Sequence, residues 1–296
     1  MTTSLSQAQH APTKWGQGRR LEFVDFRLHW DGRLNRSDLT DFFNISTPQA
    51  SLDIARYLEL APGNAAYDRS SKVYLASEKF IPLFPTNEPD RYLSELLAQA
   101  TDIIRPEHSF IGWVPPMATV PSPVRSIPSS TLVTLLSAIR RNTKVSIRYQ
   151  SMSSVEPTER VISPHAIAHD GFRWHVRAYC ERRHAFIDFV IARMLRIVGS
   201  EISGRNGSDD EAWHRNVQLV LCANPALAEA HRRVIELDYG MTAGAVELSC
   251  RQALLYYALK RLGLLDSAKV PPEQQQIVLK NVEEVGQFLP RSSEPR

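Results

Sequence analysis

The chain has 296 residues, of which 43% are apolar and 23% charged, and its formal net charge is +3. This length exceeds one ordinary domain, so we expect a multi-domain globular protein. No apolar run approaches the roughly 18 to 20 residues of a membrane-spanning helix. The N-terminal sequence lacks the apolar core of a secretory signal, so we expect a cytoplasmic protein. The three cysteines are never spaced as CxxC, which disfavours a disulfide framework and a zinc site, and we expect no metal and no cofactor.

Two stretches rich in turn-forming residues divide the chain. The segment PPMATVPSPVRSIP, residues 115–128, is rich in proline and predicts a linker between domains. The segment GSEISGRNGSDDEAW, residues 199–213, is rich in Gly, Ser and acidic residues and predicts a surface loop or linker. We therefore expect three domains, at residues 1–114, 129–200 and 213–296.

The first domain begins with a helix-turn-helix pattern. A first helix is predicted to end at Asp31-Gly32, and a second, RSDLTDFF, follows with Ser37 as its predicted N-cap. After a short turn, Thr47 is predicted to cap a third helix, with Pro48 where proline is tolerated. The predicted buried stripes are Leu21, Val24 and Leu28, then Leu39, Phe42 and Phe43, then Ala50, Ile54, Tyr57 and Leu58.

The third helix has the residue types of a helix that reads DNA. Its predicted outer face consists of Gln49, Ser51, Leu52, Asp53 and Arg56. Gln can pair with adenine, and small hydroxyl residues let the backbone approach base edges in the major groove. The following YDRSSKVY predicts two strands around a turn, a wing with cations at its tip. The predicted DNA-binding residues are Thr47, Gln49, Ser51, Arg56, Arg69 and Lys72. Residues 1–85 carry ten basic and nine acidic side chains, so a helical domain without DNA binding stays open as an alternative.

The second domain is basic and rich in arginine. Residues 129–200 contain eleven Lys and Arg against five Asp and Glu, and ten of the eleven are Arg, which suits bidentate recognition of carboxylate and phosphate. A helix at 129–141, with a predicted stripe at Leu132, Leu135, Leu136 and Ile139, precedes four predicted strands. These are KVSIRYQS, TERVISPHAIAHDG with a break at Pro164, FRWHVRAYC and HAFIDFVIARM. Short antiparallel strands of this kind predict a small barrel.

The strand FRWHVRAYC has two chemically distinct faces. Alternation directs one set toward the core: Phe172, Trp174, Val176, Ala178 and Cys180. The other face carries Arg173, His175, Arg177 and Tyr179. Two Arg with a His and a Tyr can hold an anion and stack a planar ring, so this face predicts an anionic ligand.

These strands resemble a known regulatory domain. The run RWHVRAYC, preceded by SIRY and ERVISPHAI and followed by FIDFVIARM, resembles the WYL domain of bacterial transcription regulators. Trp174, His175 and Val176 stand where that family has Trp-Tyr-Leu, so two of the three motif residues differ. The sequence WHVR is similar to the subgroup of repressors associated with the phage-defence systems BREX and CBASS. The resemblance implies an Sm-like, SH3-like small barrel behind an N-terminal winged helix-turn-helix.

The resemblance also implies a ligand site. The resemblance implies that the motif face senses an anionic nucleotide or nucleic acid. Carried onto this chain, the implied ligand-binding residues are Arg148, Tyr149, Ser163, His165, Trp174, His175, Arg177 and Arg193. From the residues themselves, a buried position for Trp174, a structural role for His165 and a pairing of Arg193 with an acidic residue all stay open.

The third domain is predicted to mix strands and helices. VQLVLCANP predicts a strand, ALAEAHRRVIELDYG a helix, and GAVELSCRQALLYYALKRLGLL a segment with helical spacing at Leu254, Leu255, Ala258, Leu259 and Leu262. The resemblance implies that this α/β extension forms a dimer, and a monomeric cap is the alternative. The expected fold class is α+β and multi-domain.

The predicted function is that of a homodimeric repressor. It would bind an inverted-repeat operator, control a phage-defence operon and its own gene, and respond to an anionic effector. The alternative is an Sm-like RNA-binding or adaptor protein without operator specificity. The sequence has no HExxH, P-loop or GxSxG motif, which disfavours an enzyme.

Overall fold

The computed structural model describes residues 14–84, 88–123, 125–265 and 270–289. The chain forms two compact units, residues 1–122 and 123–296, each described here by itself. Within the described ranges, no helix combines the length and the apolar character that crossing a bilayer requires.

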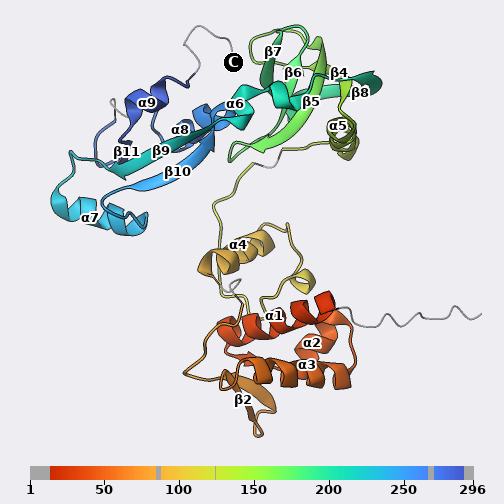
Figure 1. Cartoon of the computed structure of the whole chain (residues 1–296), viewed down its shortest axis with the longest axis vertical. Coiled ribbons are helices and arrows are strands. Elements are labelled where there is room, and N and C mark those ends of the chain that lie inside the picture. Colours follow the sequence, from red (N-terminus) through yellow and green to blue (C-terminus); the bar gives the residue numbers. More distant parts are fainter. Residues whose placement is uncertain (1–13, 85–87, 124, 266–269, 290–296) are drawn as a thin grey trace, which may run out of the picture. The chain divides into compact units, whose positions relative to one another are not determined.

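The N-terminal unit is a winged helix (Figure 1). Its elements are α1 (Lys14–Asp31), β1 (Arg33–Leu34), α2 (Arg36–Phe43), α3 (Thr47–Leu60), β2 (Ala65–Asp68), β3 (Val73–Ala76) and α4 (Pro89–Ala100). The three strands form an antiparallel sheet in the order β1-β3-β2. Phe23, Phe26 and Phe110 are among its fully buried side chains. The predicted helix-turn-helix with a wing is therefore confirmed.

Two predicted helix caps are wrong by one or two residues. α2 begins at Arg36 after Asn35, whose backbone N–H donates to Asp38 Oδ2 at 2.7 Å, so Ser37 already lies inside the helix. α3 is capped by Ser46, whose Oγ accepts the Gln49 N–H, and Thr47 is the first helical residue. In both places the residue in extended conformation just before the helix is the cap, which sequence spacing alone does not locate.

The second unit begins with the WYL region. Helix α5 (Ser129–Arg141) packs against an antiparallel five-stranded sheet in the order β7-β6-β5-β4-β8. The strands are β4 (Thr143–Tyr149), β5 (Thr158–His169), β6 (Trp174–Cys180), β7 (Ala185–Val190) and β8 (Met194–Ser203). The predicted break at Pro164 is a register shift within a continuous β5. The described edge strands β7 and β8 do not pair, so the predicted Sm-like small barrel is not confirmed.

The buried stripe of α5 differs from the predicted one. Leu135 is fully buried as expected, but Leu132 is 37% exposed and Leu136 45% exposed. Thr131 and Ala138 are buried in their place. Small residues let the helix lie close to the sheet, and the neighbouring leucines are left at the margin of the contact.

The predicted linker at 199–213 is largely ordered. β8 continues to Ser203, which pairs with Thr143 of β4, and a 3-10 helix η3 (Gly207–Asp209) and helix α6 (Glu211–His214) follow. Pairing with β4 decides the structure here, although the composition is that of a loop.

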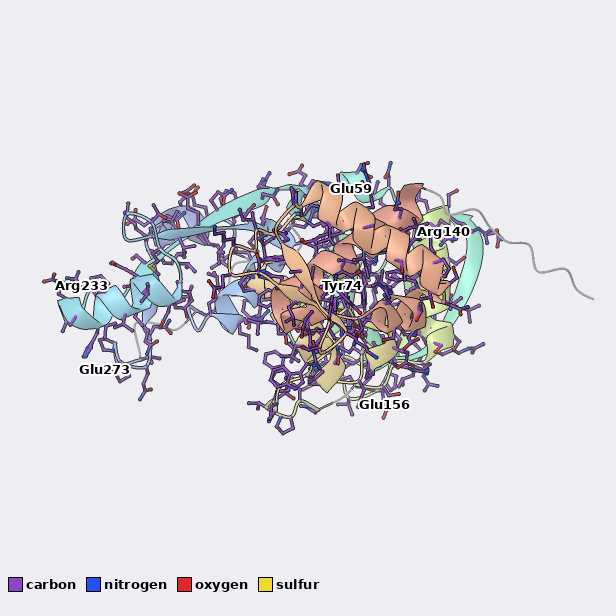
Figure 2. The ribbon with its side chains drawn as sticks, turned by 90° about the horizontal axis from the view of Figure 1, so that it is seen from below. Glu59, Tyr74, Arg140, Glu156, Arg233 and Glu273 are labelled. Carbon is purple, nitrogen blue, oxygen red and sulfur yellow. The ribbon has the colours of Figure 1, made fainter. Side chains whose placement is uncertain are left out.

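The chain ends in a C-terminal α/β domain. Its sheet has the antiparallel order β10-β9-β11, with β9 (Asn216–Ala223), β10 (Val246–Arg251) and β11 (Ile277–Leu279). The helices are α7 (Glu229–Asp238), α8 (Leu255–Arg261) and α9 (Val282–Gly286). Exposed Arg233 of α7, labelled in Figure 2, pairs with Glu229 one turn earlier. The helical spacing predicted between Leu254 and Leu262 is confirmed by α8, and the preceding VELSCR is strand β10.

Candidate nucleic-acid interface and effector site

Helix α3 is held in place by a buried ion pair with α1. Arg20 Nε donates to Asp53 Oδ2 at 2.6 Å, and a second guanidinium nitrogen donates to Oδ1 at 3.3 Å. Asp53 is fully buried, so its predicted outward position is wrong. The outward prediction failed because an acidic residue is ordinarily exposed unless it has a buried partner. Gln49 Nε2 also donates to Asp53 Oδ1 at 3.2 Å, which ties this candidate base contact to the same carboxylate.

The outer face of α3 is otherwise as predicted. Ser51 Oγ donates to the carbonyl of Thr47, and Arg56 forms an exposed pair with Glu59 at 2.8 Å. Leu52 is 64% exposed on this face. An exposed leucine on a groove-reading helix can contact a thymine methyl group. Leu52 was placed on the outer face by its spacing but was not counted among the DNA contacts, because its apolar character alone did not mark it as one.

The wing presents cations at a hydrogen-bonded turn. Between β2 and β3, Asp68 accepts hydrogen bonds from Ser70 and Ser71, and these bonds lower its pKa to about 2. Arg69 and Lys72 are both exposed at this turn, and Lys72 has a left-handed φ of 57°. Both cations are therefore exposed at the tip of the wing, and their contact with DNA phosphates stays a prediction.

On the polar face of β6, His175 and Arg177 are buried rather than open to solvent. Arg177 is 7% exposed and lies between two carboxylates. Its Nε donates to Asp210 Oδ2 at 2.7 Å, and one terminal nitrogen donates to Asp210 Oδ1 at 3.1 Å. The other terminal nitrogen donates to Asp188 Oδ1 at 3.3 Å. The face predicted to hold an external anion already holds two anions of the chain itself.

Asp210 is the centre of this cluster. It is 2% exposed, and its Oδ2 also lies 2.9 Å from His165 Nε2. Burial alone would raise the pKa of Asp210, but the hydrogen bonds from His165 and Arg177 outweigh it and hold that pKa below its usual value of 3.8. The carboxylate is therefore ionised and fully engaged.

A second set of contacts joins β6 to the C-terminal domain. His175 Nε2 lies 3.0 Å from Asp170 Oδ2, and the His175 ring lies 5.0 Å from the ring of Tyr257 on α8. The Tyr257 hydroxyl donates to Asp188 Oδ2 at 3.1 Å. Burial and the nearby Asp188 carboxylate raise the pKa of Tyr257, so this hydroxyl stays protonated and donating.

Comparison with known proteins connects these domains to one family. Residues 16–98 match the BrxR transcriptional regulator winged helix-turn-helix domain, residues 130–198 the WYL domain, and residues 216–285 the BrxR transcriptional regulator C-terminal dimerization domain. Three relatives carry the description "DNA-binding transcriptional repressor CapW". The protein from Escherichia coli (strain KTE188) is 43% identical over 288 residues, which cover 96% of this chain and 95% of the relative. The protein from Stenotrophomonas maltophilia is 45% identical over 96% of both chains, and that from Pseudomonas aeruginosa 46% over 93% of both.

The chain belongs to the CapW family of winged-helix, WYL-domain regulators. Among solved structures, it is similar to the proteasome accessory factor B/C of Arthrobacter aurescens, at 15% identity and a TM-score of 0.26, over 97% of this chain and half of that one. That likeness is too weak to inform the site.

The remaining predicted WYL site residues lie in different places. Trp174 is 51% exposed, so its predicted core position is wrong. Trp174 is the first residue of β6 and lies at the exposed end of this strand, whereas Val176 is buried. The ring of Trp174 lies 4.6 Å from that of His169. With Phe172 and Arg173 it lines a pocket of about 220 Å³. The site predicted as one surface is thus divided between a buried cluster and this aromatic pocket.

Four other predicted residues take no part in the buried cluster around Arg177. Tyr149 is 7% exposed, and its hydroxyl oxygen accepts the N–H of Val190, a structural role. Ser163 is buried on β5, Arg148 is exposed on β4, and Arg193 is half-buried after β7.

Sequence reasoning missed the acidic partners of the site. Asp188 was recoverable, because a four-residue turn at 181–184 sets Arg177 opposite Asp188 in the β6–β7 hairpin. Asp210 had no local signal, since it lies 33 residues from Arg177 in a segment predicted as a linker. Among the described residues, no group of His, Cys, Asp and Glu side chains is arranged to hold a metal ion.

Proposed function

We propose that the chain is a homodimeric, sequence-specific repressor. It binds an inverted-repeat operator, controls a phage-defence operon and its own gene, and is regulated by an anionic nucleotide or nucleic acid at its WYL domain. The working division is a DNA-binding domain at 1–114, a linker at 115–128, a ligand-sensing domain at 129–200 and a dimerisation domain at 213–296.

The proposal rests on the exposed face of α3, in a chain whose relatives are described as DNA-binding repressors. The ion pair of Arg20 with Asp53 fixes the helix, while Ser51, Leu52 and Arg56 remain on its outer side. Relatives described as DNA-binding repressors share 43 to 46% identity over nearly the whole chain. A helix positioned in this way can enter the major groove, with the wing cations on adjacent phosphates.

The dimer follows from the C-terminal domain. Residues 216–285 match a domain described as a dimerization domain in BrxR regulators. A twofold axis relates two identical reading helices, so the operator would be an inverted repeat with half-sites about one helical turn or a multiple apart.

The effector proposal rests on the arginine content and on the WYL match. Arg177 is held in the bidentate geometry that also fits a phosphate, and the pocket beside Trp174 offers a ring for stacking. An anionic nucleotide or nucleic acid has both a phosphate for Arg177 and a planar base that can stack on the ring.

The test is selection of duplex DNA from a random pool by the purified protein at near-physiological salt. We expect an enriched inverted repeat, and we expect Gln49→Ala, Ser51→Ala and Leu52→Ala to relax its sequence preference while dimerisation survives. Leu93→Ala, at a 58% exposed leucine of α4, is the control and is expected to change nothing. A folded protein that enriches no duplex, but binds single-stranded RNA, would overturn the proposal in favour of an RNA-binding adaptor.

A further inference from the structure

A short segment of the chain covers the polar face of the WYL sheet. The segment, residues 204–210 and called the strap below, leads from β8 to α6 (Figure 1). Arg205 lies 4.8 Å over the ring of Tyr179, and Asp210 binds Arg177 and His165. The strap therefore contacts several residues of the face on which an effector was predicted.

The fit of the strap depends on two glycines. A Cβ on Gly207 would lie 2.7 Å from the Cβ of His165, closer than real side chains approach. A Cβ on Gly204 would lie 3.1 Å from the Cβ of Ser163. Because the backbone lies directly against these side chains, an external ligand cannot reach Arg177 from this side unless the strap moves.

The Asp210 carboxylate occupies the position that an external anion would take. It accepts two parallel hydrogen bonds from the Arg177 guanidinium, the geometry in which arginine also binds phosphate. It is the chain's own anion, held next to its site by the covalent backbone, and thus competes at high effective concentration with any free one.

The same carboxylate connects the site to the C-terminal domain. Asp210 Oδ1 accepts the backbone N–H of Trp213, and Asp210 is thereby the N-cap of α6. Arg251 at the end of β10 donates to the carbonyl of Trp213 at 2.5 Å and lies 4.7 Å over its ring. Arg215 donates to Gln252 at 2.9 Å. Moving Asp210 would therefore uncap α6 and weaken the contacts of Trp213 in α6 with Arg251 of β10.

We propose that the strap is an internal competitor that closes the effector site. A phosphate-bearing effector binds Arg177 by displacing Asp210, and the displacement passes to the C-terminal domain through α6. The proposal rests on the proposed function, since it names how the effector site of that regulator is regulated.

A purely structural strap makes a different prediction. If Asp210 only stabilises the fold, removing its charge leaves Arg177 beside Asp188, weakens the domain, and creates no affinity for phosphate. If Asp210 is a competitor, removing its charge frees a donor pair for phosphate, and added phosphate opens the strap of the unaltered protein.

The experiment uses the full-length protein with inorganic phosphate as the probe and chloride at equal ionic strength as the salt control. Phosphate affinity is measured by calorimetry, and opening of the strap by amide hydrogen exchange across residues 204–214. Asp210→Asn keeps the shape and a capping oxygen but loses the charge. Asp209→Asn is the matched control, because Asp209 is an exposed neighbour whose partner, Arg205, lies 3.9 Å away.

We expect Asp210→Asn to bind phosphate at least tenfold more tightly than the unaltered protein and Asp209→Asn. Phosphate, but not chloride, is expected to speed exchange in the strap of the unaltered protein. The proposal would be overturned if the two Asn variants bound phosphate with equal affinity, or if saturating phosphate left the rate of amide exchange in the strap unchanged. Gly207→Ala, which keeps every charge but forces the strap off His165, is expected to bind phosphate more tightly too and decides the question if Asp210→Asn does not fold.

Operator selection by the same preparations separates the two proposals. A protein that selects no operator but shows phosphate-driven opening of the strap refutes the proposed repressor and supports the competitor. An operator-binding protein whose strap ignores phosphate refutes only the competitor.

Discussion

Replacing Arg20 with methionine removes the cation that Asp53 faces inside the winged helix. Asp53 is fully buried and Arg20 is 6% exposed, so the carboxylate would be left in the core with Gln49 as its remaining described side-chain donor. Removing one partner of a buried ion pair destabilises a protein by about 3 to 5 kcal/mol, because the other charge stays buried and uncompensated. We expect Arg20→Met to lower the stability of the winged helix by that amount.

Two further variants test whether the uncompensated buried charge of Asp53 causes this loss of stability. Arg56→Met removes a cation from the exposed pair of Arg56 with Glu59 on α3, whose side chains are 52% and 65% exposed, and is expected to change stability by about 0 to 1 kcal/mol. The double variant Arg20→Met with Asp53→Leu removes the buried charge itself and is expected to recover most of the loss.

The assay is native-state hydrogen exchange, which reports the free energy of opening for buried amides of α1 and α3 without requiring that the whole chain unfold in one step. If Arg20→Met changes the opening free energy no more than Arg56→Met, the ion pair does not hold α3 in place. If the double variant is as unstable as Arg20→Met, the buried charge is not the cause of the loss.

Three other outcomes are expected. The pKa of Asp210 is lower in the folded chain than its usual value, so Asp210 stabilises the fold above about pH 4, and this contribution is lost as the pH falls and the carboxylate is protonated. Acid unfolding of Asp210→Asn is expected to lack this loss, and an equal dependence of stability on pH in the two proteins would contradict it. Tyr257→Phe removes the hydrogen bond to Asp188 and is expected to lower thermal stability by about 1 to 2 kcal/mol, measured by calorimetry, whereas an unchanged midpoint would show that the bond is not formed in solution. Lys72→Ala is expected to weaken operator binding equally for all sequences and to reduce the salt slope by about one, and a loss confined to one sequence would contradict a phosphate contact.

The sequence alone determined the elements that repeat a local pattern. The stripe of Leu21, Val24 and Leu28 predicted α1, the YDRSSKVY pattern predicted the wing, and the helix at 129–141 has the predicted bounds. The WYL resemblance rested on a contiguous run of residues, and the family comparison confirmed it. Periodicity and contiguous motifs are local properties, so they can be read without knowing what the chain packs against.

Tertiary structure decided what the polar side chains do. Arg20 meets Asp53 and Arg177 meets Asp210 across 33 residues in each case, and both acids were expected on a surface or in a linker. For Trp174 the difference has the opposite sign, because it was predicted in the core and is half-exposed in a pocket. Whether a charged or aromatic side chain is buried depends on the partner that a distant segment brings to it, because burial of a charge is tolerated only when a partner compensates its desolvation. That partner is set by the register and packing of whole elements, which no local stretch of the sequence encodes.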